Sequence, residues 1–195
     1  METRTEIIQR LIDKYKLTSY VEIGVQNKDN NFNKIKCELK IGVDPDPNAK
    51  ATYPITSNDF FFIAITHGVK YGLIFVDGLH HEDQGDKDLE NALECLEDGG
   101  WIVVHDCNPE NELHQRVPRE SKIWNGDVWK SFVKLRERED LDMVTIDCDY
   151  GCGIIRKGTQ TPLRRTEELT YENLEKNRSG WLYLVSPDFF ERIYL

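Results

Sequence analysis

The hydrophobic positions of this chain alternate between short unbroken apolar runs and stretches with helical spacing. Residues 3–16, 57–68 and 83–96 place apolar side chains three and four positions apart, which is typical of amphipathic helices. Four apolar runs have the length and composition of buried strands: YVEIGV at 20–25, KIGVDP at 40–45, LIFV at 73–76 and WIVV at 101–104. This alternation predicts a parallel sheet covered by helices.

The second half of the chain continues the pattern and then changes it. Residues 127–139 have the spacing of a helix, and two further apolar runs at 141–149 and 152–157 flank the turn Asp149-Tyr150-Gly151, which predicts an antiparallel hairpin. We therefore expect an α/β fold: a doubly wound, Rossmann-like, mainly parallel seven-stranded sheet with an antiparallel edge strand and helices on both faces. Residues 31–36 predict a weak helix, and residues 52–56 predict a short edge strand because of Pro54.

Two regions follow from this pattern. Residues 1–156 form the expected domain, including an N-terminal helix that covers it. Residues 157–195 form a helical and aromatic extension that is too apolar for a disordered tail, and we expect it to pack on the domain or on a second subunit. If the extension packs on a second subunit, we expect a homo-oligomer joined through this C-terminal segment.

The central strand, helix, strand unit carries the most informative chemistry. The run LIFV ends in Asp77, with His80 and His81 after it, and the run WIVV ends in His105 and Asp106. Gly99 and Gly100 are expected to stop the intervening helix. Because the carboxyl ends of neighbouring parallel strands meet, all these side chains should crowd one edge of the sheet, where ligands bind in open α/β folds.

A structural interpretation of the same residues exists. In it, Asp77 caps the following helix, His80 and His81 are solvated, and Asp106 ends a strand in a turn. For a single histidine this interpretation is preferable, but the presence of the whole group at two adjacent strand ends favours a functional site.

Composition limits the class of partner. The formal net charge is −10, so the chain lacks the basic footprint of a nucleic-acid-binding protein. It contains neither a signal-peptide core nor an apolar stretch long enough to span a bilayer, and the five cysteines include no Cys-x-x-Cys pair. These features predict a cytoplasmic protein with reduced cysteines and a small-molecule substrate, with no nucleic acid or membrane as partner.

The first two strands suggest a nucleoside site. Gly24 follows the first strand, and Asp44 lies twenty residues later at the end of the second, the spacing of a carboxylate that binds ribose hydroxyls. A dinucleotide fingerprint would need glycine at Gln26 and Asp29, so a cofactor without a pyrophosphate fits better. S-adenosylmethionine is the common cofactor that meets this description.

The motifs VEIGV, IGVDPDP, TSNDFF, LIFVDGLHH, GGWIVVHD and DYGCGIIR, in this order, resemble class I S-adenosylmethionine-dependent methyltransferases, in particular the small bacterial branch associated with sugar, glycan and natural-product gene clusters. The resemblance covers residues 18–156. It implies that the cofactor binds to Glu22, Gly24, Asp44, Ser57, Asn58 and Asp77. The usual family loop has another glycine after the first strand, and here residues 27–30 are Asn-Lys-Asp-Asn.

The resemblance also implies a catalytic half. Acids at the matching strand ends of related O-methyltransferases bind a divalent cation, which gives Asp77, His105 and Asp106 as metal ligands and Mg²⁺ or Mn²⁺ as the ion. The catalytic candidates are Asp77, His80 and His105, because methyl transfer to a hydroxyl needs a group that accepts its proton. The expected activity is O-methylation of a small polar molecule such as a sugar or sugar nucleotide, with a metal assisting.

Two other functions use the same features. A non-catalytic domain of methyltransferase ancestry that binds a nucleoside or a protein is favoured by the altered loop at residues 26–30. A metal-dependent hydrolase or hydroxylase could use the same acids and histidines.

Overall fold

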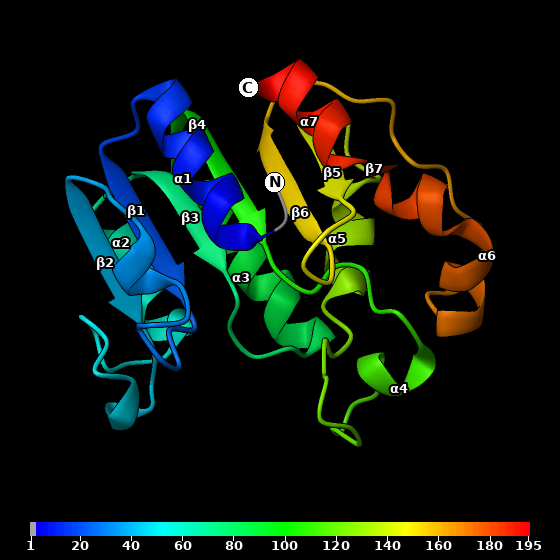
Figure 1. The fold of residues 1–195 in the computed structure, drawn as a ribbon, viewed down its shortest axis with the longest axis horizontal. Coiled ribbons are helices and arrows are strands. Elements are labelled where there is room, and N and C mark those ends of the chain that lie inside the picture. The colour runs from blue at the N-terminus through cyan, green and yellow to red at the C-terminus, as the bar shows by residue number, and fades with distance from the viewer. Residues whose placement is uncertain (1–2) are drawn as a thin grey trace.

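Seven strands form one sheet with the order β2-β1-β3-β4-β6-β5-β7 in the computed structural model, which describes residues 3–195 (Figure 1). All neighbouring pairs are parallel except those of β6, which is antiparallel to both β4 and β5. The strands are β1 (Ser19–Ile23), β2 (Leu39–Val43), β3 (Tyr71–Val76), β4 (Leu96–Val104), β5 (Leu141–Ile146), β6 (Cys152–Lys157) and β7 (Leu184–Val185). The predicted fold class is confirmed.

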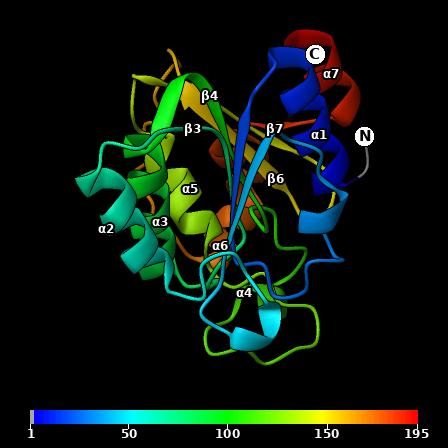
Figure 2. The ribbon, with the colours of Figure 1, turned by 90° about the vertical axis from the view of Figure 1, so that its left-hand side faces the viewer.

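Helices cover both faces of this sheet. Figure 2 shows α2, α3 and α5 on one side and α1 and α7 on the other. The helices are α1 (Arg4–Tyr15), α2 (Ser57–Thr66), α3 (Glu82–Glu94), α4 (Glu112–Gln115), α5 (Trp129–Leu135), α6 (Tyr171–Leu182) and α7 (Pro187–Tyr194), with the 3₁₀ turns η1 (Phe32–Lys34) and η2 (Pro47–Ala49).

The unbroken apolar runs reflect burial on both faces. In β3, Ile74 and Val76 pack in the cluster beneath α2, α3 and α5, whereas Leu73 and Phe75 pack in the cluster beneath α1 and α7. Each fully buried side chain of this size stabilises the fold by about 1.5–3 kcal/mol relative to its exposed state. The central strands are therefore rigid supports for whatever follows their ends.

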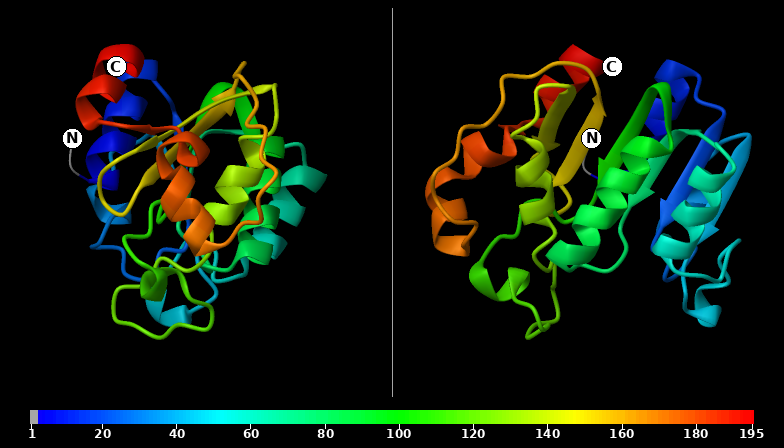
Figure 3. Two further views of the ribbon diagram at one scale, coloured as in Figure 1. Left: turned by 90° about the vertical axis from the view of Figure 1, so that its right-hand side faces the viewer. Right: turned by 180° about the vertical axis from the view of Figure 1, so that it is seen from behind.

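The C-terminal extension packs on the same sheet. Strand β7 pairs with β5, and α7 places the fully buried Phe190 in the cluster shared with α1. The hydroxyl of Tyr15 donates to the carbonyl oxygen of Tyr194 at 2.7 Å. Figure 3 shows α6 beside α5 and α7 beside the N-terminal helix.

Several expected details differ in the structure. The antiparallel strand β6 lies inside the sheet rather than at its edge, because β5 and the two-residue β7 follow it. Residues 52–56 form only an isolated bridge from Tyr53 to Val43, consistent with the missing N–H of Pro54. Gly99 and Gly100 lie within β4, near a shift of its register with β3, whereas α3 ends earlier, at Glu94. Residues 31–36 contain a 3₁₀ turn instead of an α-helix.

Across residues 3–195, the helices are all too short or too polar to cross a membrane.

Candidate functional site

The ends of β3 and β4 bring Asp77 and His105 side by side. Val76 and Val104 are register partners, and each next residue donates its backbone N–H to the strand beside it: Asp77 to Ile23 at 2.9 Å and His105 to Val76 at 3.0 Å. The backbone is thus fixed up to the last residue of each strand. Two of the side chains predicted to crowd this edge, Asp77 and His105, are therefore neighbours.

Two carboxylates and two imidazoles form the centre of the group. Asp77 Oδ1 lies 3.3 Å from both His80 Nε2 and His105 Nδ1. Asp106 Oδ2 lies 3.2 Å from His80 Nδ1 and 3.3 Å from His105 Nδ1. Each acid therefore faces both histidines, and each histidine faces both acids. We call these four residues the acid–histidine cluster.

Arg4 and Asp149, which the sequence pattern did not indicate as site residues, lie against the acid–histidine cluster. Arg4 Nη1 lies 3.1 Å from Asp149 Oδ2 and 3.3 Å from His105 Nε2, and Arg4 Nε lies 3.9 Å from Asp77 Oδ2. The backbone N–H of Arg4, at the start of α1, donates to Asp149 at 2.8 Å, so the acid also satisfies an otherwise unpaired helix terminus. The hairpin turn and the N-terminal helix thus join the site.

The electrostatics follow from this arrangement. Burial alone would lower the pKa of His105, but Asp77, with Asp106 and Asp149, raises it well above its ordinary value. Burial would raise the pKa of Asp77, but His105 and His80 lower it below its ordinary value. Burial would also raise the pKa of Asp149, but His105 and Arg4 lower it to about 2. These neighbours favour the charged form of Asp77 and Asp149.

A divalent ion could replace part of the positive charge that Arg4 and the two histidines place beside the acids. Ligand atoms of Asp77, His80 and Asp106 lie within 4.8 Å of one another. Octahedral ions bind their ligands at about 2.1 Å, which places neighbouring ligands roughly 3 Å apart, so this envelope has the right size. The group contains His80 where the sequence suggested His105, although His105 Nδ1 is equally close to both acids.

The structure contradicts two parts of the structural interpretation, a cap at Asp77 and a solvated His80, whereas Asp106 does follow the end of β4. The N-terminal amide of α3, on Glu82, is bonded by Asp127 Oδ1 at 2.7 Å, so Asp77 is not the helix cap. The His80 side chain is only 20% exposed and stacks on Trp124 with ring centroids 5.2 Å apart. His81 contacts the same indole edge-on and lies outside the cluster.

Glu22 is buried rather than open to a loop. Its carboxylate accepts hydrogen bonds from the Tyr20 hydroxyl and from the Asn31 amide, the latter at 2.8 Å. Burial raises its pKa to about 7, although the two hydrogen bonds lower it. Thr5 donates to Asn31 Oδ1 at 2.7 Å, which links this network to α1.

The turn after β1 is held by the conformation of Gly24 and by the carboxylate of Asp44. Gly24 has φ +86°, and a Cβ there would lie 1.9 Å from the carbonyl oxygen of Asp77, so only glycine fits. Gln26 adopts a left-handed conformation with φ 50°, and its N–H donates to Asp44 Oδ2 at 2.7 Å. Asp44 Oδ1 accepts the N–H of Asp46 at 2.8 Å. Each oxygen of Asp44 keeps a further lone pair for a ligand.

Ser57 and Asn58 open α2, but Thr56 is the residue that caps this helix. Both side chains accept from the Gln84 amide, at 3.2 Å and 3.0 Å, which links α2 to α3. The role of these two residues in cofactor binding remains a prediction.

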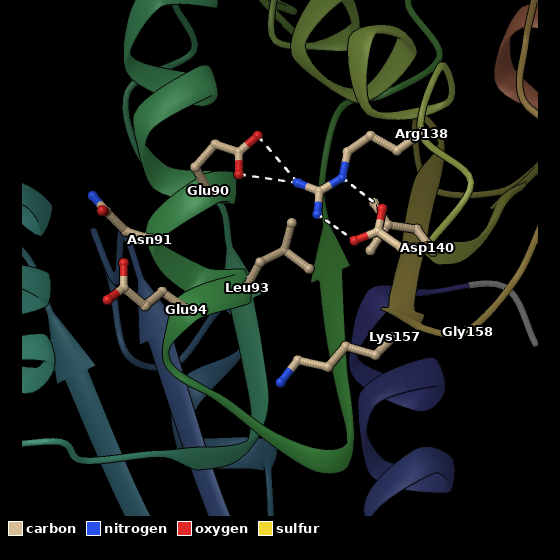
Figure 4. Close-up of a pocket in the computed structure, with 9 residues that line it drawn as sticks. Glu90, Asn91, Leu93, Glu94, Arg138, Asp140, Lys157 and Gly158 are labelled. Carbon is tan, nitrogen blue, oxygen red and sulfur yellow. Dashed lines mark hydrogen bonds and ion pairs between the residues drawn. The ribbon is translucent and has the colours of Figure 1, made fainter.

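Within the described part of the chain, two of the surface hollows lie near opposite edges of the sheet. One of about 300 Å³ lies beside the cluster and is lined by His81, Glu82, Asp83, Asp86, Val117 and Asp127. The larger, of about 580 Å³, lies at the amino edge, where β5 begins and β6 ends, and Arg138 bridges Glu90 and Asp140 there (Figure 4). Its salt bridges already pair Arg138, and it is remote from the strand ends that carry the site.

Comparison with known proteins agrees with this geometry. Residues 41–107 match the model of a methyltransferase domain family. No curated sequence matches the chain significantly. Among solved structures, the S-adenosylhomocysteine-bound methyltransferase PaMTH1 of Podospora anserina superposes with a TM-score of 0.59 at 16% identity, over 81% of this chain and 80% of that one.

Two further structures share the fold. The O-methyltransferase TomG of Streptomyces achromogenes, in complex with S-adenosylmethionine, gives a TM-score of 0.54 at 12% identity over 78% of this chain and 77% of its own. MycE, from the mycinamycin biosynthetic pathway, gives 0.54 at 13% identity over 84% of this chain and 52% of its own, in complex with Mg, S-adenosylhomocysteine and mycinamycin VI. The model matches part of the chain, and the superpositions show that the fold is the one found in S-adenosylmethionine-dependent methyltransferases, as the sequence motifs predicted.

Proposed function

We propose that this chain is an S-adenosylmethionine-dependent O-methyltransferase that acts on a hydroxyl of a small polar acceptor, such as a sugar or sugar nucleotide. The observation that carries the proposal is the acid–histidine cluster, which adjoins the nucleoside half of the same edge: the carbonyl oxygen of Asp77 packs directly on Gly24. A methyl donor and a hydroxyl need this proximity to react.

The cofactor half fits the residues present. The left-handed turn at Gly24 and Gln26 replaces the usual glycine-rich loop and orients a backbone N–H toward Asp44. Asp44 would bind the ribose hydroxyls, and the turn at Gly24 would lie beside the methionine portion. PaMTH1 and TomG bind S-adenosylhomocysteine and S-adenosylmethionine, respectively, on the same fold.

The acceptor half fits a divalent cation, Mg²⁺ or Mn²⁺. Carboxylate oxygens of Asp77 and Asp106 would hold it together with one histidine, and imidazole makes Mn²⁺ more competitive than an all-oxygen site does. A bound cation lowers the pKa of a coordinated hydroxyl and orients it. The Mg in the MycE structure supports this part of the proposal.

The two histidines have different roles in this proposal. A cation on Asp77 and Asp106 would offset the acids that raise the pKa of the histidines. One of His80 and His105 could then be a neutral ligand, and the other could accept the proton from the acceptor hydroxyl. Asp149 and Arg4 hold His105 from its other side, which fixes the ring plane. The polar lining of the 300 Å³ hollow beside His81 supports a polar acceptor.

Calorimetry with S-adenosylmethionine and S-adenosylhomocysteine tests the proposal. We expect both to bind, and then radiolabelled methyl transfer to a panel of sugars and sugar nucleotides to depend on added Mg²⁺ or Mn²⁺. Absence of binding to both compounds would reject the methyltransferase. Metal binding without cofactor binding would instead indicate a hydrolase or hydroxylase, and cofactor binding without transfer to any acceptor would indicate a binding domain.

A further inference from the structure

The segment Trp124-Asn125-Gly126-Asp127, between α4 and α5, contacts the site with every residue. Trp124 stacks on His80, and a Cβ at Gly126 would lie 1.8 Å from the carbonyl oxygen of His80. The N–H of Asp127 donates to that same oxygen at 3.2 Å. This segment therefore fixes the backbone and the ring of His80 together.

Asn125 performs a different task in this segment. Its side-chain amide donates to Asp106 Oδ1 at 2.6 Å, and both residues are buried, with exposures of 1% and 4%. The other oxygen of Asp106, Oδ2, faces His80 and His105. The amide thus distinguishes two chemically equivalent oxygens and determines which one is presented to the cluster.

The backbone on both sides of this contact is constrained. Asp106 has φ 63°, a left-handed conformation that is uncommon for a residue other than glycine. The N–H groups of Asn125 and Gly126 both donate to the carbonyl oxygen of His114, at 2.8 Å and 3.1 Å. Two fixed backbones leave the rotation of the Asp106 carboxylate as the remaining freedom, and the Asn125 amide restricts it.

The Asn125 amide is satisfied at one end only. Its nitrogen donates to Asp106, whereas its buried Oδ1 has no hydrogen-bond donor among residues 3–195, which is unfavourable. An apolar residue of the same size would avoid that penalty but would leave Asp106 Oδ1 without this donor.

We propose that Asn125 is a positioning residue for Asp106, which keeps Oδ2 turned toward the two histidines and the candidate cation position. The consequence for methyl transfer rests on the function proposed above. The orientation itself does not.

Crystal structures of the wild type and of the Asn125→Leu and Asn125→Ala variants, without metal and at one pH, test the orientation directly. We expect the Asp106 carboxylate to rotate away from its wild-type position in both variants while His80 and the sheet stay in place. An Asp106 carboxylate with unchanged contacts to both histidines would overturn the proposal. Asn111→Ala is the matched control, because Asn111 caps α4 in the same loop without contacting Asp106.

Ligand binding separates this result from the proposed function. Manganese affinity, followed by electron paramagnetic resonance, should fall by about 10-fold or more in Asn125→Ala, as for other residues that orient a metal ligand. Binding of S-adenosylhomocysteine and the circular dichroism spectrum should not change. If the wild type binds no Mn²⁺, the metal part of the proposed function fails, while the orientation of Asp106 in the crystals still decides the role of Asn125. Unchanged Mn²⁺ affinity together with an unchanged Asp106 would reject it.

Discussion

Single residues at the carboxyl edge combine burial with charge, and Asp106 does so most sharply. It is buried, left-handed and in contact with both histidines, so its replacement must preserve the backbone. Asparagine tolerates the left-handed region and has the same shape, whereas alanine would add backbone strain.

Asp106→Asn should therefore keep the fold and lose the function of the carboxylate. We expect methyl transfer to fall by about 100-fold and its response to Mg²⁺ or Mn²⁺ to disappear, because a neutral amide is a weak ligand for a hard cation. The measurement is initial rate against metal concentration, with Asp98→Asn, an exposed acid of the same strand, as the control. Unchanged turnover would remove the metal mechanism.

The raised pKa of Glu22 predicts an unusual dependence of the free energy of unfolding on pH. Its pKa is raised from 4.5 to about 7 by burial, so between these values the folded state binds more protons than the unfolded state. The free energy of unfolding therefore falls as pH rises through this window and stays lower above it. The full difference is about 3 kcal/mol for a single group.

Glu22→Gln should remove that slope, because an amide does not titrate. The amide oxygen can still accept hydrogen bonds from Tyr20 and Asn31, so the fold should be kept. Urea denaturation at pH 5 and pH 8 measures it: the variant should gain stability relative to the wild type at pH 8 and little at pH 5. Glu175→Gln, on an exposed position of α6, should retain the wild-type slope. A parallel pair of pH profiles for Glu22→Gln and wild type would contradict the prediction.

Gly24 and Gly68 separate steric overlap from backbone strain. Both have positive φ, +86° and +65°, but a Cβ at Gly24 would overlap Asp77, whereas one at Gly68 meets nothing within 4 Å. Gly68→Ala should lose about 1 kcal/mol from strain alone. Gly24→Ala should lose at least about 2 kcal/mol more, because the end of β3 has to move. Equal losses in thermal unfolding would show that Asp77 does not confine this position.

The sequence predicted those site residues that end strands, and missed those that reach the site through packing. Asp77, His105 and Asp106 follow apolar runs, so their common edge follows from parallel pairing. Asp149 could have been found, because a hairpin turn after β5 must lie at the same edge as the end of β4. Arg4 and Asn125 gave no such signal, since a helix start and a long loop reach the site only through the packing of whole elements.

Elements were predictable where burial fixes their pattern. The strands β1 to β6 and the helices α1, α2 and α3 occur where the periodicity placed them, because both faces of the sheet are covered. Strand β7 was missed, since two residues carry no alternation. Gly99 and Gly100 were misread as a helix end, because glycines at an irregular strand start look the same in a sequence.

Helix α7 should be part of the folding unit rather than an appendage. Phe190 is fully buried against the cluster beneath α1, so Phe190→Ala should lower the free energy of unfolding by about 3–5 kcal/mol. Phe189→Ala, one position away and only partly buried, should lose about 1 kcal/mol. Chemical denaturation measures both. A small loss for Phe190→Ala would show that α7 docks without supporting the sheet.

At the scale of the whole molecule, cofactor binding should stabilise the complete fold. The proposed contacts at Gly24 and Asp44 adjoin β1, β2 and β3, the first half of the sheet. S-adenosylhomocysteine at 100 times its dissociation constant adds about 2.7 kcal/mol, which raises the melting temperature of a chain this size by roughly 5–10 °C. Methionine alone should give no shift. A melting curve that S-adenosylhomocysteine leaves unchanged would argue against this cofactor.

The contact between Arg4 and Asp149 has a consequence for biosynthesis. Domains fold as units during translation. Here Arg4, in the first turn of α1, can form its contacts with Asp149 only after the hairpin of β5 and β6 has been synthesised. The charges around His105 are therefore balanced only after synthesis has passed Asp149. A fragment that ends between residues 106 and 148 contains both histidines but lacks Asp149, so such a premature termination product should be inert.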